Sequence, residues 1–216
     1  MNFDYDIIIS CGTYQEAAGG LELMAERNFK QLKKQDLKIA FLCSEKASKN
    51  DSDLLPLLNK KRKIKSIIRL IRFFKKNKIK IIHSHHAHDL WVLVPALKLS
   101  GSRNTRLYLT KHMASGISKK DIFHRLLYKR INKVFAVSGF IKHNILQTCP
   151  VPENKVHTLP NGINVDDFRR SNFNDEDIRS EFKIDKDKII IGLIGRITLG
   201  KGHYEFIKAA EIVNKK

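Results

Sequence analysis

The sequence predicts an α/β fold, a doubly wound parallel sheet with helices on both faces, followed by an incomplete second domain. Short runs of β-branched and apolar residues alternate with segments in which apolar residues recur every three to four positions, the order of repeated β-loop-α units. Glycine-containing turns follow several of these runs directly. In open α/β sheets, ligands bind at the edge where the strands end in such turns.

The first sheet is expected to hold six strands, and five helices are expected to alternate with them. The polar stretch 44–53 is expected to be a loop. The strands are Tyr5–Ser10, Lys38–Leu42, Lys80–His83, Arg106–Thr110, Lys133–Val137 and Lys155–Leu159, and the helices are Leu21–Lys34, Lys60–Lys76, one ending near Ser100, Asp121–Asn132 and Gly139–Gln147.

Domain boundaries follow from a change of composition after residue 165. Residues 1–165 form the expected first domain, and the polar, acidic segment 166–187 reads as a linker with one or two helical turns. Residues 188–216 begin the second domain with a buried strand, Ile189–Ile194, and a helix that follows Gly202.

The turn between this late strand and helix carries two cations, Arg196 and Lys201, beside glycines. A guanidinium can bind two phosphate oxygens at once and an ammonium adds a point charge, so the pattern favours diphosphate binding. A helix cap with two solvated cations stays open as the alternative. A nucleotide triphosphatase P-loop is rejected, because Gly202 stands where a Ser or Thr hydroxyl should bind magnesium.

A second glycine turn, Gly19-Gly20, follows the first strand and opens the first helix. Its backbone N–H groups could approach an anion, while Glu22 in the first helical turn suits the helix dipole. A flexible loop before a capped helix is the alternative.

The segment Lys60–Lys76 is a basic amphipathic helix. The expected apolar face holds Ile64, Ile67, Ile68, Ile71 and Phe74. Such a helix can lie on an anionic membrane, or it can pack on the sheet with a solvated basic outer face. The second interpretation is favoured for the apolar face, and both hold if only the basic edge meets lipid head groups.

Histidines gather where the third strand ends, in Ser84-His-His-Ala-His. His83 and His85 share one side at strand spacing, but no third ligand stands at a metal-like interval apart from Asp89. No metal site is therefore predicted, and the alternatives are a pocket rim that binds hydroxyls or phosphates and locally satisfied side chains. His112, alone after the fourth strand, is the better functional candidate.

The chain has 216 residues and a formal net charge of +19, which attracts phosphates, nucleic acid or anionic membranes. Nucleic-acid binding is disfavoured because aromatic residues are not interleaved with the basic run. The 3 cysteines are scattered, which favours a reducing cytosol without a disulfide framework. The acidic start and the absence of a long apolar run predict neither a signal peptide nor a membrane span.

These pieces together resemble family 4 glycosyltransferases. The motifs that carry the resemblance are Gly19-Gly-Leu-Glu22, Ile81-Ile-His-Ser-His-His86, Val134-Phe-Ala-Val-Ser138, Leu159-Pro-Asn-Gly-Ile-Asn-Val-Asp-Asp-Phe168 and Gly195-Arg-x-x-x-x-Lys-Gly202. They stand in the family's order and cover nearly the whole chain. The resemblance implies a GT-B fold, in which two Rossmann-like domains face each other across a cleft.

The resemblance also implies roles. Arg196 and Lys201 would neutralise the departing diphosphate of a nucleotide-sugar donor, and the loop at Gly19 and Gly20 would close over the phosphates. His112 matches the histidine near the transferred sugar. His83, His85 and Asn161 would belong to the acceptor side or pocket rim. Transfer is expected to retain configuration, with no cofactor and no metal.

One departure from the family pattern concerns the donor side. Family members carry a glutamate pair about two helical turns apart, whereas the acids after Lys201 here are Glu205 and Glu211 on one predicted helix. We therefore expect a truncated or split product that is inactive without a separate polypeptide supplying the rest.

The resulting expectation is a cytoplasmic enzyme, peripheral on the inner membrane face, that transfers a sugar to a lipid-linked or envelope glycan acceptor such as lipopolysaccharide. A non-catalytic remnant or binding domain of the same fold is the alternative.

Overall fold

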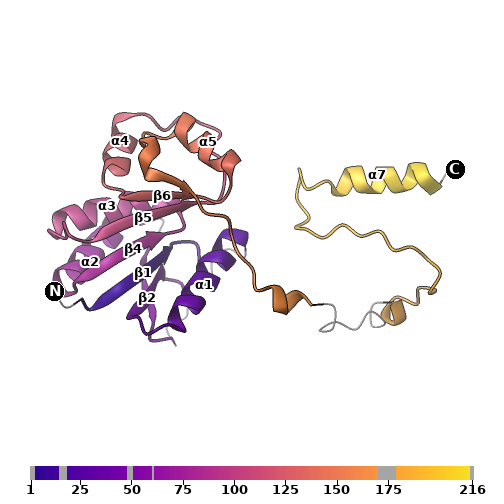
Figure 1. Ribbon diagram of the computed structural model, residues 1–216, viewed down its shortest axis with the longest axis horizontal. Coiled ribbons are helices and arrows are strands. Elements are labelled where there is room, and N and C mark those ends of the chain that lie inside the picture. The colour runs from indigo at the N-terminus through magenta and orange to yellow at the C-terminus, as the bar shows by residue number, and fades with distance from the viewer. Residues whose placement is uncertain (1–2, 15–18, 48–50, 60, 170–178, 215–216) are drawn as a thin grey trace. The chain divides into compact units, whose positions relative to one another are not determined.

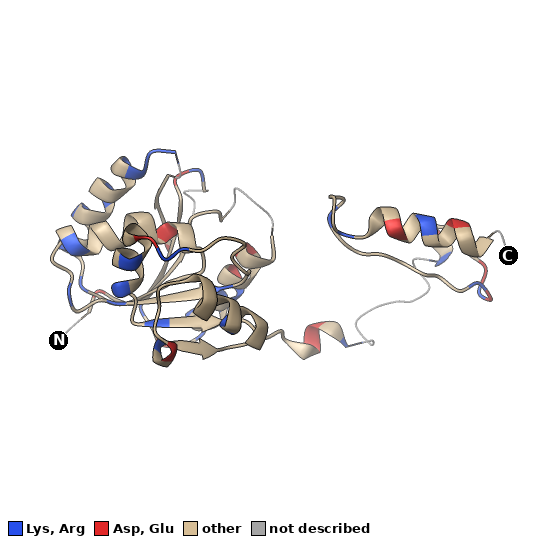
Figure 2. Cartoon of the chain, turned by 90° about the horizontal axis from the view of Figure 1, so that it is seen from above, with Lys and Arg blue, Asp and Glu red and all other residues tan. Residues whose placement is uncertain are grey.

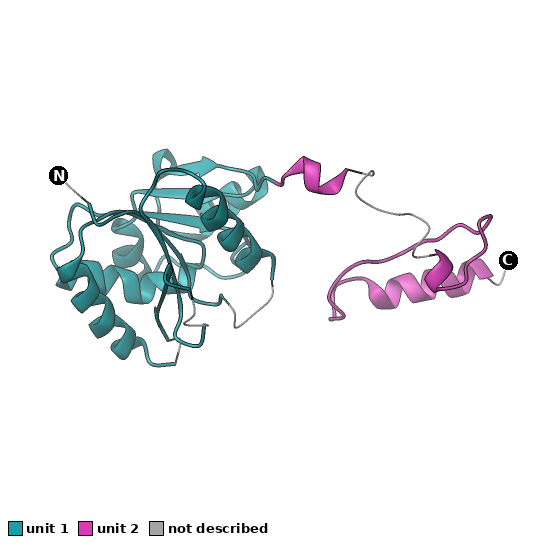
Figure 3. Cartoon of the chain, turned by 90° about the horizontal axis from the view of Figure 1, so that it is seen from below, with its two compact units in different colours: residues 1–162 teal, residues 163–216 magenta. Residues whose placement is uncertain are grey.

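The computed structural model describes residues 3–14, 19–47, 51–59, 61–169 and 179–214. Two compact units divide the chain, residues 1–162 and 163–216 (Figure 3). The expected loop 44–53 and linker 166–187 fall partly on residues 48–50 and 170–178, which lie outside the described part.

The first unit is built on a seven-stranded, all-parallel sheet in the order β3-β2-β1-β4-β5-β6-β7 (Figure 1). The strands are β1 Tyr5–Cys11, β2 Ile39–Ser44, β3 Leu54–Leu58, β4 Ile79–Ser84, β5 Arg106–Lys111, β6 Lys133–Ala136 and β7 Val156–Thr158. The order reverses between β1 and β4, so the carboxyl ends of these strands flank the crevice where such sheets bind ligands.

Helices cover both faces of the sheet, as the sequence predicts. They are α1 Gly20–Lys33, α2 Lys63–Lys76, α3 Leu90–Leu99, α4 Ile122–Lys129 and α5 Gly139–Thr148, with short 3₁₀ turns η1 Ala87–Asp89, η2 Glu153–Lys155 and η3 Val165–Phe168. Alternation along the strands separates two cores: Ile9 and Phe41 pack with Phe29 of α1, whereas Ile8 and Ile82 pack with the helices of the opposite face.

One strand was missed by sequence reasoning. The strand β3 contains Pro56, which cannot donate to a ladder and argues against a central strand. The strand pairs only with β2, at the edge of the sheet, where a missing N–H is tolerated.

The interpretation of α2 as a helix packed on the body of the unit is correct, but its predicted apolar face needs a correction. Ser66, Leu70 and Phe74, spaced four residues apart, are the buried positions. Ile64 is 75% exposed and Ile68 46% exposed, so these two side chains face solvent at the N-terminal end of the helix.

The core of α2 gives a stability prediction. Leu70 is fully buried between α2, α3 and the sheet, so Leu70→Ala should lower the free energy of unfolding by about 2–5 kcal/mol through lost burial and a residual cavity. The exposed Leu23→Ala on α1 is the matched control and should change it by less than about 0.5 kcal/mol. Urea unfolding followed by circular dichroism measures both, and equal effects would contradict the packing.

In the second unit, one of the two predicted elements is confirmed and the other is wrong. The predicted helix after Gly202 forms as α7 His203–Asn214. The predicted strand Ile189–Ile194 is wrong: the segment is extended but unpaired, and Ile194 is fully exposed. A parallel strand needs neighbours for its N–H and C=O groups, and the described residues of this unit provide no partner strand.

Candidate functional site

The loop after β1 and the loop after β4 are joined by one buried carboxylate. Asp89 accepts hydrogen bonds from the Ser10 hydroxyl (2.7 Å) and the Gly12 backbone N–H (3.0 Å), and pairs with His86 Nδ1 at 3.2 Å. A Cβ at Gly12 would lie 2.5 Å from a carboxylate oxygen of Asp89, so only glycine fits this close approach. The two strand ends at the topological switch point are thus fixed to each other.

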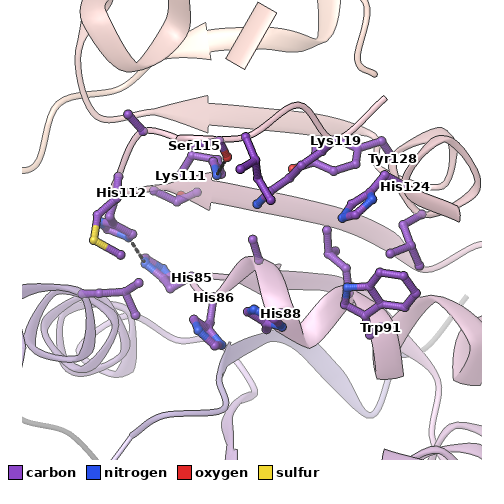
Figure 4. Close-up of a pocket in the computed structure, with 18 of the residues that line it drawn as sticks. His85, His86, His88, Trp91, Lys111, His112, Ser115, Lys119, His124 and Tyr128 are labelled. Atoms are coloured by element: carbon purple, nitrogen blue, oxygen red, sulfur yellow. Dashed lines mark hydrogen bonds between the residues drawn. The ribbon is translucent and has the colours of Figure 1, made fainter. Parts of the chain in front are cut away.

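Three of the predicted histidines, His83, His85 and His112, meet at the carboxyl ends of β4 and β5. Figure 4 shows His85 and His112 of this group. His85 Nδ1 lies 3.0 Å from His112 Nε2, and their rings stack with centroids 5.3 Å apart. His83 packs on His85 with centroids 4.6 Å apart, and its Nε2 lies 2.7 Å from the Thr110 hydroxyl. The sheet register brings these side chains together because parallel neighbours place matching residues on one face.

The hydrogen-bond chain favours one tautomer for each of two rings. The Asn28 amide nitrogen, 3.4 Å from His85 Nε2, can only donate, so this His85 nitrogen is the acceptor. Neutral His85 then carries its proton on Nδ1, and this N–H donates a hydrogen bond to His112 Nε2. Neutral His112 therefore carries its proton on Nδ1, for which the described part of the chain provides no hydrogen-bond acceptor.

Burial keeps this cluster uncharged. Desolvation, with repulsion from His112, lowers the pKa of His83 to about 4, and desolvation with the two neighbouring imidazoles lowers the pKa of His85 to about 2. Desolvation also lowers the pKa of His112, and the nearby Glu22 opposes this shift. His112 is thus suited to donate a hydrogen bond to a ligand oxygen in its neutral form.

These shifts predict acid sensitivity. The unfolded chain binds a proton at each histidine near pH 6.5, whereas folded His83 does so only near pH 4, so the unfolded state binds more protons in between. We expect the free energy of unfolding to fall as the pH drops from about 7 to about 4. Urea midpoints across this range measure it; His83→Gln should flatten the slope, and a midpoint that rises on acidification would contradict the assignment.

A cavity of about 570 Å³ opens beside His112. Its walls come from the 3₁₀ turn and α3 after β4, the loop after β5, and α4. The lining residues are Leu21, Lys63, His85, His86, Ala87, His88, Leu90, Trp91, Thr110, Lys111, His112, Met113, Ala114, Ser115, Gly116, Ile117, Lys119, His124, Leu127 and Tyr128. None of them is an Asp or Glu.

The loop that carries His112 is held in place by α5. The Ser115 N–H donates to Asn144 Oδ1 (2.7 Å), and the Asn144 amide nitrogen donates back to the Ser115 carbonyl (3.1 Å). Further along, the Lys119 N–H donates to the Thr148 carbonyl at 2.7 Å. The loop is therefore preorganised by the body of the unit.

The remaining predicted residues lie in different places. Gly19 and Gly20 stand at the N-terminal end of α1, beside Leu21 of the cavity wall. Asn161 is exposed and does not line this cavity. Arg196 and Lys201 are exposed in the second unit, in a turn where the Arg196 carbonyl binds His203 Nε2 at 2.9 Å.

Sequence reasoning missed several residues of the site. No sequence motif identified Asn28, Lys111 or Ser115 as part of the site, or Asp89 as the link between two loops. For Lys111 a signal existed, since a lysine ends a buried strand directly before the candidate histidine. Among the described residues, no group of three or more His, Cys, Asp or Glu side chains is arranged to hold a metal ion.

The parallel sheet with a histidine-lined cavity at its carboxyl edge defines a Rossmann-like unit of the GT-B kind. The chain belongs to glycosyltransferase family 4, whose family model matches residues 18–167.

Two curated relatives are each 26% identical to the chain. The capsular polysaccharide biosynthesis glycosyltransferase CapM of Staphylococcus aureus aligns over 87% of this chain and 53% of its own length. The alpha-maltose-1-phosphate synthase of Mycolicibacterium smegmatis aligns over 60% of this chain and 36% of its own length. The chain thus spans about half the length of the first relative and less of the second.

Solved structures show the same fold. A glycosyltransferase from Rickettsia africae matches with a TM-score of 0.80 at 21% identity, covering 98% of this chain and 58% of that one. Anabaena HepE, solved in complex with UDP and glucose, matches with a TM-score of 0.65 at 13% identity, covering 95% of this chain and 57% of that one.

Proposed function

We propose that the protein takes part in transfer of a sugar from a nucleotide-diphosphate sugar to a lipid-linked or envelope glycan acceptor, with residues 1–162 forming the acceptor side. The observation that carries the proposal is His112 at the carboxyl edge of the sheet, where burial lowers its pKa and His85 engages its Nε2, while no partner for its Nδ1 stands among the described residues. The names of the relatives add a capsular polysaccharide and a sugar phosphate as product classes, and HepE was solved with UDP and glucose.

The other assigned residues complete the proposal. Arg196 and Lys201 would neutralise the leaving diphosphate, and Gly19 and Gly20 would bring backbone N–H groups to it. Both cations are exposed, and Gly200 and Gly202 hold positive φ values in their turn, a backbone conformation that glycine adopts without strain.

A transfer assay tests the proposal. The 216-residue chain is assayed alone and mixed with the C-terminal half of the Staphylococcus aureus relative, using radiolabelled UDP-glucose, UDP-N-acetylglucosamine and GDP-mannose with bacterial membrane extract. We expect label in the lipid or polysaccharide fraction from the mixture and none from the chain alone. Donor turnover by the intact relative with no transfer by the mixture would contradict transfer and favour the alternative, a binding domain without turnover.

Contact with an anionic membrane surface is the remaining part of the proposal. No helix of the described residues is long and apolar enough to cross a bilayer. Lys and Arg are spread over the first unit (Figure 2), and α2 presents the exposed Ile64 and Ile68 beside Lys61, Arg62 and Lys65.

Co-sedimentation with lipid vesicles tests this contact. The chain should sediment with vesicles that contain phosphatidylglycerol and not with pure phosphatidylcholine vesicles, and Ile64→Ser should weaken the association.

A further inference from the structure

A buried lysine in the cavity has no anionic partner among the residues that the structure describes. Lys111 is 6% exposed, and its Nζ donates to the Ser115 hydroxyl at 3.2 Å. An ammonium has three donors, and burying its charge is costly unless an opposite charge compensates it. The pKa of Lys111 is lowered by desolvation and by the neighbouring Lys119, and none of the described residues that line the cavity is an Asp or Glu.

Other polar groups line the same cavity. Lys63 and Lys119 line it, and Lys63 Nζ lies 5.5 Å from the Trp91 ring centre. The Tyr128 hydroxyl is buried beside the Cys149 thiol, yet it forms no hydrogen bond of normal geometry within the described residues. Cations from α2, β5 and the following loop and a spare hydroxyl from α4 therefore line one cavity. Figure 4 labels three of these groups, Lys111, Lys119 and Tyr128.

The donor types indicate which anion fits. Arginine is the residue that pairs a planar carboxylate through two parallel hydrogen bonds, and the cavity has none. Lysine acts as a point charge, and several such donors around one space suit a tetrahedral phosphate. Met113 (68% exposed) and Ile117 (71% exposed) form an apolar part of the rim.

We propose that this cavity binds a phosphate group of the acceptor, held by Lys111 together with Lys119 and Lys63. The inference rests on the proposed function, since it names the acceptor class for the same site: a sugar phosphate or a phosphate-linked lipid. The phosphate sits beside His112, so it anchors the acceptor next to the place where the transferred sugar binds.

Calorimetric titration of the 216-residue chain tests the proposal with inorganic phosphate, glycerol 3-phosphate, monomeric dihexanoyl phosphatidylglycerol, acetate and methyl glucoside. We expect saturable binding of the phosphates, with acetate and methyl glucoside weaker by about tenfold or more. Tighter binding of the lipid than of glycerol 3-phosphate identifies a lipid acceptor, and equal binding a soluble one. Acetate binding as tight as phosphate, or no phosphate binding, would overturn the proposal.

Variants locate the site. Lys111→Met keeps the side-chain length in a buried position and should weaken phosphate binding about tenfold; Lys119→Met, on the loop, should weaken it severalfold without a folding risk. Lys129→Met is the matched control, because Lys129 is exposed on α4 and does not line the cavity, and its binding should stay within about twofold. Unchanged binding in both cavity variants would show adventitious contact with surface cations and overturn the assignment.

Different results would refute the phosphate-site proposal and the sugar-transfer proposal. Transfer to a phosphorylated acceptor at an unchanged rate in Lys111→Met would refute the phosphate site and leave the transfer proposal intact. Phosphate binding that depends on Lys111, with no transfer in any preparation, would refute transfer and leave the phosphate site intact.

Discussion

His112→Ala is expected to reduce the rate of sugar transfer by about 100-fold or more, the loss typical of removing one donor that stabilises a transition state. The reason is the proton arrangement: Asn28 and His85 fix His112 in the tautomer with Nδ1–H available to the sugar. The measurement is kcat/KM in the transfer assay with the C-terminal half of the relative present.

Two conservative variants separate this role from a structural one. The Asn amide nitrogen can occupy the position of His Nδ1, whereas the Gln amide nitrogen matches Nε2, so His112→Asn should recover part of the rate and His112→Gln should not. The control is His143→Ala, because His143 is exposed on α5 and bonds Gln147 instead (2.8 Å). Recovery by Gln and not by Asn would show that the tautomer is assigned the wrong way round.

Asp89→Ala should lower the free energy of unfolding of the first unit by about 2–4 kcal/mol. Asp89 is 5% exposed, and its removal leaves the Ser10 hydroxyl and the Gly12 N–H buried without an acceptor. The loops after β1 and β4 would also lose their shared anchor, so transfer should fall as well.

Urea unfolding at pH 7.5 measures the effect of Asp89→Ala. The matched control is Asp36→Ala, in the exposed turn after α1, with an expected change below about 0.5 kcal/mol. A similar small change for Asp89→Ala would mean that the two loops hold their positions without this carboxylate.

Much of the first unit could be predicted because its signals are local. Apolar runs and helical spacing gave the parallel sheet, its flanking helices and the position of His112, since the carboxyl end of a strand is set by the strand itself. The edge strand β3 could not be found this way, because Pro56 breaks a strand pattern and only its position at the sheet edge makes it tolerable.

The sequence did not predict residues whose roles depend on partners far away along the chain. Asp89 serves Gly12 across 77 positions of sequence, and Asn28 orients His85 across 57. The face of α2 was predicted only in part: Phe74 is buried and Ile67 and Ile71 pack partly on the core, but Ile64 and Ile68 are exposed. Several registers of an isoleucine-rich helix bury apolar residues equally well, and packing against α3 and the sheet selects Leu70 over Ile64. The strand at Ile189–Ile194 failed because a strand needs neighbours that the local pattern cannot supply.

The most direct test of the assignment is the long-range ¹H–¹⁵N spectrum of the histidine rings in the 216-residue chain at neutral pH, before and after addition of glucose 1-phosphate. We expect the spectrum to show neutral His85 and His112, both protonated on Nδ1, with the His112 signals shifting as glucose 1-phosphate binds. His112 protonated on Nε2, or ligand-induced shifts confined to exposed histidines such as His143, would contradict it.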